Sequence, residues 1–231
     1  PSGTTTIVTE TMEMNFCAGY KAALEFIKSA ENQPIKIFLT VSPMISISKG
    51  ARKRVFDLEA FHKLLRRNSV IGMGEAYWSQ VLRGEESLLQ LFEMTQKSGK
   101  KIEGHTAGAR DGKLQAYVAA GNLADHEPIN VEEALERLRL GIHVMIREGD
   151  IRQDLAEISK ILKNGIDLRR LSFCSDGINP IDMMEMGYME AVIQKAIDIG
   201  FDPIVALQMA SLNAAHHFGV DDFIGGISPG K

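Results

Sequence analysis

Short apolar runs alternate with longer amphipathic stretches along almost the whole chain. The short runs are rich in Val, Ile and Leu, as buried strands are, and the longer stretches have the three- and four-residue apolar spacing of helices. The predicted strands cover residues 5–9, 35–41, 70–75, 101–105, 123–126, 143–147 and 171–176. The predicted helices cover residues 17–31, 57–67, 85–98, 111–120, 131–140, 151–164, 181–200 and 203–217.

Capping residues support several of these helix boundaries. Asn130 precedes one helical stretch, and Asp202 with Pro203 opens the last one, as N-terminal caps do. Glycines stand where four helices should end, because glycine readily adopts the left-handed conformation that closes a helix. These glycines are Gly99, Gly121, Gly165 and Gly200.

The alternation of strand and helix, at intervals of about 30 residues, predicts parallel strand–helix–strand units in an α/β fold. Seven strands are predicted, whereas a (β/α)₈ barrel of the TIM type has eight strands in about 250 residues. We therefore expect an incomplete barrel, with about seven units, in a single domain of residues 1–231. A doubly wound open sheet is the alternative, although no glycine-rich dinucleotide or phosphate loop follows the first strand.

Composition and charge indicate which binding partners and which cellular setting to expect. The 231 residues carry a formal net charge of −4, which favours neither nucleic acid nor an anionic membrane surface as partner. The basic residues Lys49, Arg52, Lys53 and Arg54 form one cluster, which we interpret as a solvated loop. Two cysteines, Cys17 and Cys174, without a CxxC pair indicate a reducing, cytoplasmic setting.

Residues that can bind a metal or transfer a proton stand at the ends of successive predicted strands. They are Glu75, His105, His126 with Glu127, and Asp176. Because the carboxyl ends of parallel barrel strands converge on the face that carries the active site, we expect these side chains to lie on one rim. Two histidines and two carboxylates suit a divalent metal such as Zn, Mn or Fe, which activates water at neutral pH.

Other notable residues are expected to have structural roles. His62, His143, His216 and His217 fit surface or helix-capping positions. The methionine-rich segment with Met183, Met184, Met186 and Met189 is interpreted as packing.

Several segments together resemble the adenine deaminases of the metal-dependent amidohydrolase superfamily. These are residues 104–108 (GHTAG), 114–121 (LQAYVAAG), 125–127 (DHE), 132–141, 144–149 (VMIREG), 174–176, 3–9 and 226–231. The resemblance covers nearly the whole chain, and its most specific feature is the DHE strand followed by the IREG strand.

The resemblance implies a (β/α)₈ amidohydrolase barrel flanked by a β-sandwich, and hydrolysis of adenine to hypoxanthine and ammonia. It implies one or two Mn, Fe or Zn ions, a small purine or related heterocycle as ligand, and a homo-oligomer for the full-length protein. It carries over metal-ligand roles to Glu75, His105, His126 and Asp176, with Asp176 also moving a proton. It places Glu127, Arg147 and Glu148 near the substrate, with Glu127 in a catalytic position.

The chain also departs from the family pattern. It has no His-x-His pair, so we expect a fragment that lacks the first barrel strand and the β-sandwich, with an incomplete metal site. Met12 stands where the family has a histidine, and Gly177 where it more often has a second aspartate. Two alternatives stay open: another amidohydrolase, acting on an imidazolone or dihydropyrimidine ring, and a catalytically silent barrel fragment.

Overall fold

The computed structural model describes residues 2–43 and 57–230. The chain divides into two compact units, one of Thr5–Leu123 and one of Ala124–Lys231 with Pro1–Thr4. The basic cluster at residues 49–54 lies outside the described residues. In the part of the chain that is described, no helix combines the length and apolar character needed to cross a membrane.

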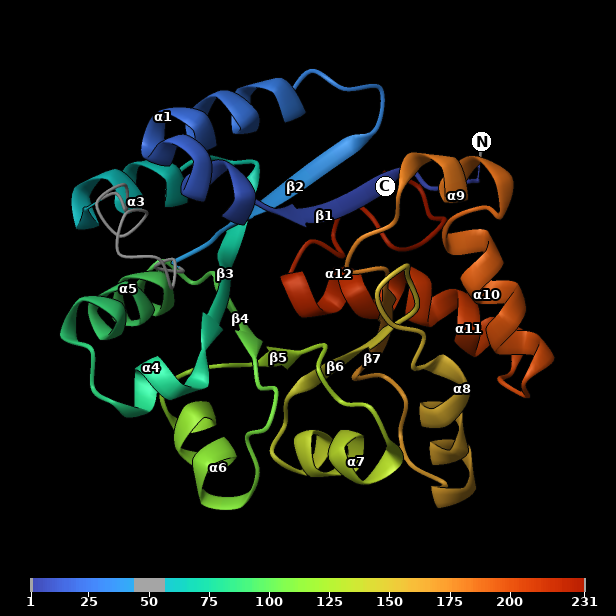
Figure 1. Cartoon of the computed structure of the whole chain (residues 1–231). Helices are drawn as coiled ribbons and strands as arrows, with labels where there is room; N and C mark the ends of the chain where they lie inside the picture. The colour runs from blue at the N-terminus through green and yellow to red at the C-terminus, as the bar shows by residue number, and fades with distance from the viewer. Residues whose placement is uncertain (1, 44–56, 231) are drawn as a thin grey trace. The chain divides into compact units, whose positions relative to one another are not determined.

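The unit of Thr5–Leu123 is built on four parallel strands that follow one another in chain order. These strands are β1 (Thr6–Glu10), β2 (Lys36–Val41), β3 (Val70–Tyr77) and β4 (Lys101–His105). Its helices are α1 (Met12–Ala30), α3 (Leu58–Leu65), α4 (Trp78–Leu82), α5 (Glu86–Lys97) and α6 (Asp111–Ala119). Helices α1, α3 and α5 lie on the same side of the strands (Figure 1).

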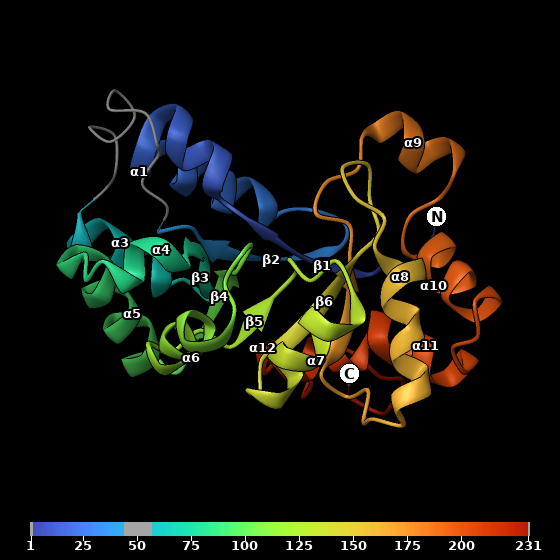
Figure 2. The same cartoon turned by 60° about the horizontal axis from the view of Figure 1, so that its bottom comes forward.

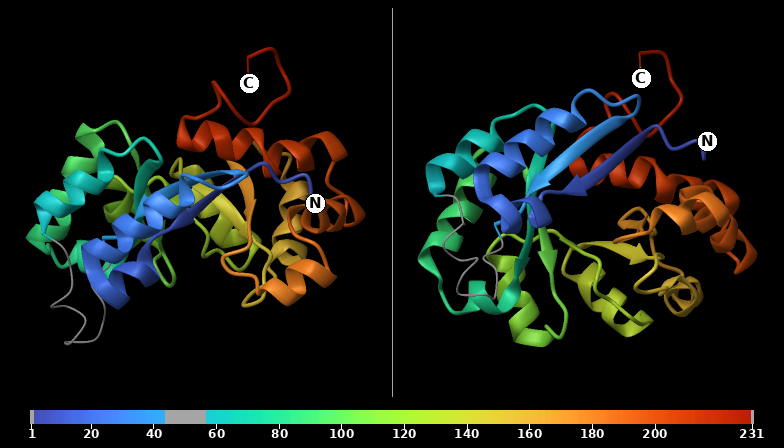
Figure 3. Two further views of the ribbon diagram at one scale, coloured as in Figure 1. Left: turned by 90° about the horizontal axis from the view of Figure 1, so that it is seen from above. Right: turned by 45° about the horizontal axis from the view of Figure 1, so that its top comes forward.

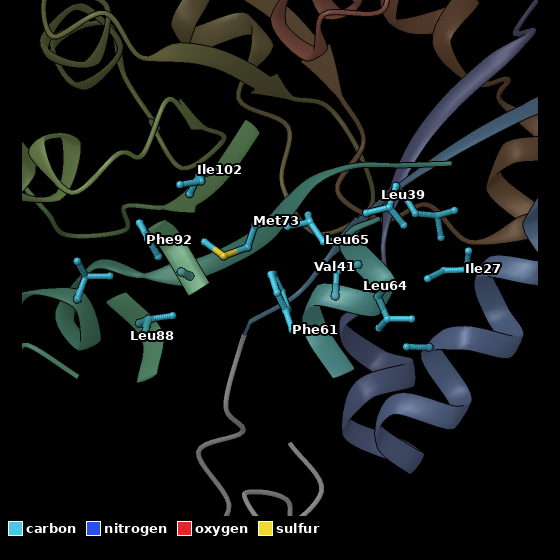
Figure 4. Packing of buried hydrophobic residues seen from close by; sticks show 14 of the residues in the cluster. Ile27, Leu39, Val41, Phe61, Leu64, Leu65, Met73, Leu88, Phe92 and Ile102 are labelled. Atoms are coloured by element: carbon cyan, nitrogen blue, oxygen red, sulfur yellow. The ribbon is translucent and has the colours of Figure 1, made fainter. Parts of the chain in front are cut away.

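The core of this unit lies between the strands and these three helices. Figure 4 shows Ile27 of α1, Phe61 of α3 and Phe92 of α5 turned toward Leu39 and Met73 of the strands. All five side chains are at most 2% exposed, and burial of each contributes about 1.5–3 kcal/mol. The helices therefore pack on the strands through the apolar residues that defined the predicted strands and helices.

The unit of Ala124–Lys231 contains three parallel strands, again in chain order. They are β5 (Ala124–Asp125), β6 (His143–Arg147) and β7 (Leu171–Cys174). The helices are α7 (Val131–Arg139), α8 (Leu155–Ile158), the 3₁₀ helix η1 (Ser159–Asn164), α9 (Pro180–Glu185), α10 (Met189–Asp198), α11 (Pro203–Ala210) and α12 (Leu212–Phe218). Helices α7 and α8 pack beside β6, and α11 and α12 beside β7 (Figure 2).

Within each unit, the strand order runs without the reversal that marks a doubly wound sheet. Consecutive parallel strands joined by helices are the arrangement of a (β/α) barrel. All seven predicted strands are present, with boundaries within three residues of the prediction.

The predicted caps are confirmed. The Asn130 side chain accepts a hydrogen bond from the Glu133 amide at 2.9 Å, and Asp202 accepts from Ile204 and Val205. The four glycines predicted to end helices all have positive φ angles, between 60° and 117°. Local signals therefore set these boundaries correctly, because a cap depends only on residues close by in the sequence.

Three long predicted helices are broken in the structure. Residues 151–154 form a turn before α8, because the Asp154 amide bonds back to the Arg147 carbonyl. The predicted helix 181–200 is interrupted near Gly187, whose φ is 92°, and the helix 203–217 is interrupted at Ser211. Figure 3 draws these two segments in orange and red. The predicted helix 17–31 begins earlier, at Met12, and kinks at Gly19, while α4 was not predicted.

Two further expectations are wrong, the first of them only in part. Met189 packs against the buried apolar cluster of its unit as expected. Met183, Met184 and Met186 are 40%, 85% and 62% exposed, so they do not pack in the core, and α9 is a short helix without buried residues. His143 is not a surface residue but is 3% exposed. Its ring stacks on that of His217 with 4.5 Å between ring centres, and its Nε2 lies 2.9 Å from the Ser172 hydroxyl.

We predict that Lys100→Met lowers the free energy of unfolding by about 1–3 kcal/mol, because the lost ammonium leaves partly buried carbonyls without a donor. Lys100 Nζ donates to the carbonyls of Leu65, Arg67 and Val70, where the end of α3 enters β3. Chemical denaturation measures the change. The matched control is Lys97→Met, which removes only an exposed pair with Glu93 and should cost under about 1 kcal/mol. Equal effects of the two substitutions would contradict the role of Lys100.

We also predict that acid destabilises the protein through His143. Burial first, and then the charges of His217 and Arg170, hold the pKa of His143 well below its usual 6.5. Below about pH 6.5, His143 therefore binds a proton in the unfolded chain but stays neutral in the folded chain. The free energy of unfolding falls as the pH falls through that value. In His143→Gln, the loss of unfolding free energy from about pH 7 to pH 5 should be smaller by about 1 kcal/mol or more. The exposed His62→Gln should match the unsubstituted protein.

Candidate metal and catalytic site

An irregularity in β3 turns Glu75 toward His105. Met73 pairs with Ile102 and Ala76 pairs with Gly104, so β3 has one more residue than β4 between these pairs. Met73 and Ala76 both join the buried core. Without the extra residue, Glu75 would share the face of Met73, because strand side chains alternate. With it, Glu75 Oε2 lies 3.3 Å from Nδ1 of His105.

Glu10, at the end of β1, contacts the backbone of this bulge. Its Oε2 accepts a hydrogen bond of 2.8 Å from the Glu75 amide. A Cβ atom at Gly74 would lie 2.4 Å from the same oxygen, so a side chain at position 74 would displace this carboxyl group. Burial, followed by repulsion from Glu75, raises the pKa of Glu10 from 4.5 to about 8, although bonds from the Glu75 amide and Ser42 lower it.

Two aromatic residues, at the end of β3 and the start of α4, contact His105 and the loop that follows it. The rings of Tyr77 and His105 meet edge to face, with 4.8 Å between centres. The Trp78 indole, at the start of α4, donates to the Ala107 carbonyl at 2.9 Å. The short helix α4 therefore anchors the loop that follows His105.

In the other unit, His126, Glu127 and Asp176 form a group. The group offers one ligand atom from each residue, and these atoms lie within 4.8 Å of one another. His126 Nε2 is 3.2 Å from Glu127 Oε1 and 3.9 Å from Asp176 Oδ2. The preceding Asp125 is fully buried and accepts from Arg137 Nε of α7 at 3.0 Å. This pair joins the end of β5 to α7. It therefore fixes the position of the backbone segment that carries His126 and Glu127.

Two arginines hold the carboxylates of this group. Arg147, at the end of β6, donates to Glu127 Oε1 at 2.6 Å and pairs through its other terminal nitrogen with Asp176. Arg152 donates to Glu127 Oε2 at 2.9 Å. Arg147 and Glu127 are only 6–7% exposed, and buried charges of this kind persist because each has an opposite charge to bond.

The turn after β6 lies against the backbone around Asp176. Asp176 has a φ of 46°, a strained value for a residue with a side chain. Gly149 approaches so closely that a Cβ atom there would lie 2.0 Å from the Ser175 carbonyl. The Asp150 carboxylate accepts from the amide and side chain of Asn179. These contacts hold the strained segment in place.

Glu148 has structural partners for both carboxylate oxygens. Oε1 bonds to Lys195 of α10, and Oε2 accepts from the Leu155 amide at 3.2 Å. These bonds tie the turn to α8 and α10. The predicted contact of Glu148 with a substrate stays a prediction.

The structure thus places the sequence-predicted residues in two sets. Glu75 and His105 lie together in the first unit, and His126, Glu127, Arg147 and Asp176 lie together in the second. Sequence reasoning missed Glu10 and Arg152. Glu10 had the same signal as the others, a carboxylate at a strand end, but Arg152 stood inside a predicted helix and had no signal.

The chemistry of these donors fits a divalent metal. Imidazole nitrogens and carboxylate oxygens are the ligands that Zn, Mn and Fe sites use. In the second unit, His126 and two acidic residues come close enough to bind one ion, and in the first unit Glu75 and His105 point at each other.

Comparison with known proteins identifies relatives of this chain. Curated relatives include an adenine deaminase of Cenarchaeum symbiosum, 38% identical over 99% of this chain and 38% of its own length. An adenine deaminase of Staphylothermus marinus is 34% identical over 99% of the chain and 39% of its length. The chain therefore spans about two-fifths of the length of these curated relatives.

Solved structures share the fold. A β-aspartyl dipeptidase from Fervidobacterium islandicum AW-1 covers the whole chain with a TM-score of 0.70 at 18% identity, over 68% of its own chain. An adenine deaminase does so with a TM-score of 0.67 at 15% identity, over 67% of its chain. The prediction of an incomplete amidohydrolase barrel with seven strands is confirmed. The sequence model described as the amidohydrolase family matches residues 2–231, and the chain belongs to that family.

Proposed function

We propose that the protein is a metal-dependent hydrolytic deaminase that converts adenine and water to hypoxanthine and ammonia. One observation carries the proposal: the buried residues His126, Glu127 and Arg147 meet the exposed Asp176 in a chain that aligns over 99% of its length with an adenine deaminase. The first two residues of the group belong to the DHE segment, and Arg147 to the IREG segment.

We assign the metal-ligand roles to Glu75, His105, His126 and Asp176. The support comes from each unit separately, since each brings its own donors within a few ångströms. A divalent ion bound by either set of donors would lower the pKa of water toward 7 and polarise the carbon–nitrogen bond. Mn, Fe and Zn all suit the donor set.

Asp176 is assigned to take the proton of the attacking water on Oδ2. Arg147 pairs with the same oxygen, so it fixes the direction of that carboxylate. Glu127 is the second catalytic residue: Arg147 and Arg152 orient its two oxygens, which suits proton exchange with a nitrogen of the purine. Arg147 and Glu148 are assigned to bind the substrate, and the bonds of Glu148 to Lys195 and Leu155 also hold the turn that carries Arg152.

Three further expectations belong to the proposal. The free thiols of Cys17 and Cys174 suit a reducing, cytoplasmic setting. The substrate is a small purine in purine metabolism, and the full-length protein is a homo-oligomer. Oligomer formation stays a prediction from the family resemblance.

A second candidate is hydrolysis of another cyclic amide, of the imidazolone or dihydropyrimidine type. Its support is structural: a dihydroorotase matches with a TM-score of 0.66, close to the 0.67 of the adenine deaminase. Met12 and Gly177, which depart from the adenine deaminase pattern, keep this candidate open. A substrate panel that includes adenine, dihydroorotate and an imidazolone separates the two.

We predict that Asp176→Asn lowers kcat for adenine by about 10²–10⁴-fold, since asparagine cannot accept the proton. Ammonia release and the ultraviolet change from adenine to hypoxanthine measure turnover, with Mn, Fe or Zn supplied after treatment with a chelator. Asp198→Asn, at an exposed end of α10, is the matched control and should keep full activity.

Either of two results would reject parts of this proposal. Near-normal turnover in Asp176→Asn removes the proton-transfer role from Asp176. No ammonia from adenine with any of the three metals, together with turnover of a different ring in the panel, replaces adenine by that substrate.

A further inference from the structure

We propose that Glu10 is a positioning residue for the metal ligand Glu75: its carboxylate binds the backbone amide of the β3 bulge and so keeps the Glu75 side chain beside His105. The inference rests on the proposed function, because it concerns a residue assigned there to the metal. It assigns a role to a residue that the sequence analysis had not singled out.

The bulge leaves the backbone amide of Glu75 in need of a hydrogen-bond acceptor. Between the pairs Met73–Ile102 and Ala76–Gly104, two residues of β3 face the single residue Glu103 of β4. A bulge of this kind leaves part of the backbone outside the hydrogen-bond ladder. The Glu75 amide instead donates to Glu10 Oε2 at 2.8 Å. A buried amide without an acceptor is costly, so this bond stabilises the bulge.

The surroundings of Glu10 are shaped for this one contact. Gly74 leaves open the space that the carboxylate occupies, since a Cβ atom there would lie 2.4 Å from Oε2 and 2.7 Å from the carboxyl carbon. Glu10 thus links the carboxyl end of β1 to the bulge in β3.

Loss of the contact has a specific consequence for Glu75. A shift of one residue turns a strand side chain to the opposite face. If the bulge relaxed into a regular strand, Glu75 would share the face of Met73, which packs in the apolar core. The carboxylate would then leave His105, whose Nδ1 is 3.3 Å away in the bulged strand.

Four variants test the assignment. Glu10→Ala removes the acceptor, and Gly74→Ala blocks the space for the carboxylate. Glu10→Gln keeps an amide oxygen that accepts the same bond but cannot ionise. Glu13→Ala, an exposed acidic residue in the first turn of α1, is the matched control. Glu10→Asp, one methylene shorter, serves if Glu10→Ala does not fold.

The first readouts need neither metal nor substrate. Nuclear magnetic resonance measures hydrogen exchange at the Glu75 amide and the ring signal of His105 in the metal-free protein. We expect exchange to quicken by about tenfold or more in Glu10→Ala and Gly74→Ala, with a shifted His105 signal. Glu10→Gln and Glu13→Ala should resemble the unsubstituted protein.

The second readout is Mn²⁺ affinity by titration calorimetry. Residues that orient metal ligands typically contribute 10–100-fold to affinity, so Glu10→Ala and Gly74→Ala should weaken Mn²⁺ binding by about that factor. Glu10→Gln should stay within about threefold of the unsubstituted protein, because the amide oxygen still holds the bulge.

The outcomes separate the possibilities. Unchanged exchange at the Glu75 amide in Glu10→Ala overturns the proposal. Equal loss of Mn²⁺ affinity in Glu10→Gln and Glu10→Ala also overturns it, since Glu10 would then bind the ion itself. If the unsubstituted protein binds no Mn²⁺, Fe²⁺ or Zn²⁺, the proposed metal centre fails, and amide exchange alone decides the role of Glu10.

Discussion

One extra residue in β3 determines how the first unit presents its polar groups. Strand side chains alternate between two faces, and Met73 packs in the apolar core. A regular strand would therefore bury Glu75 on the same side. The bulge between Met73 and Ala76 lets Met73 and Ala76 both pack in the core while Glu75 points to His105 on the other face. The glycine at position 74 and the Glu10 carboxylate make this conformation possible.

The second unit meets a different constraint, which is the burial of charge. Glu127, Arg147 and Asp125 are all at most 7% exposed, and an isolated charge at such a depth would be strongly unfavourable. Each has a partner: Arg137 for Asp125, and two arginines for Glu127. Since Arg147 also pairs with Asp176, the same bonds that make burial tolerable set the direction of both proposed catalytic carboxylates.

The bulge in β3 and the paired buried charges explain why a barrel rim suits hydrolytic chemistry. In each unit, the strands pack against helices through an apolar core that involves none of the polar rim residues. The polar groups can then be strained or charged without weakening the core, as the positive φ of Asp176 illustrates. The adenine deaminase, dipeptidase and dihydroorotase of the same fold show that such an arrangement carries several reactions, so the substrate depends on the rim.

By itself the sequence determined the seven strands, most helix ends and the strand-end positions of Glu75, His105, His126 and Asp176, because periodicity and caps are local properties. It also determined the amidohydrolase family, through segments that stay contiguous in the chain. The breaks in the long C-terminal helices, the burial of His143 and the roles of Glu10 and Arg152 were decided only by the tertiary structure. Glu10 meets Glu75 across 65 residues and Arg152 meets Glu127 across 25. No local pattern records such a contact, because it exists only once the strands have paired.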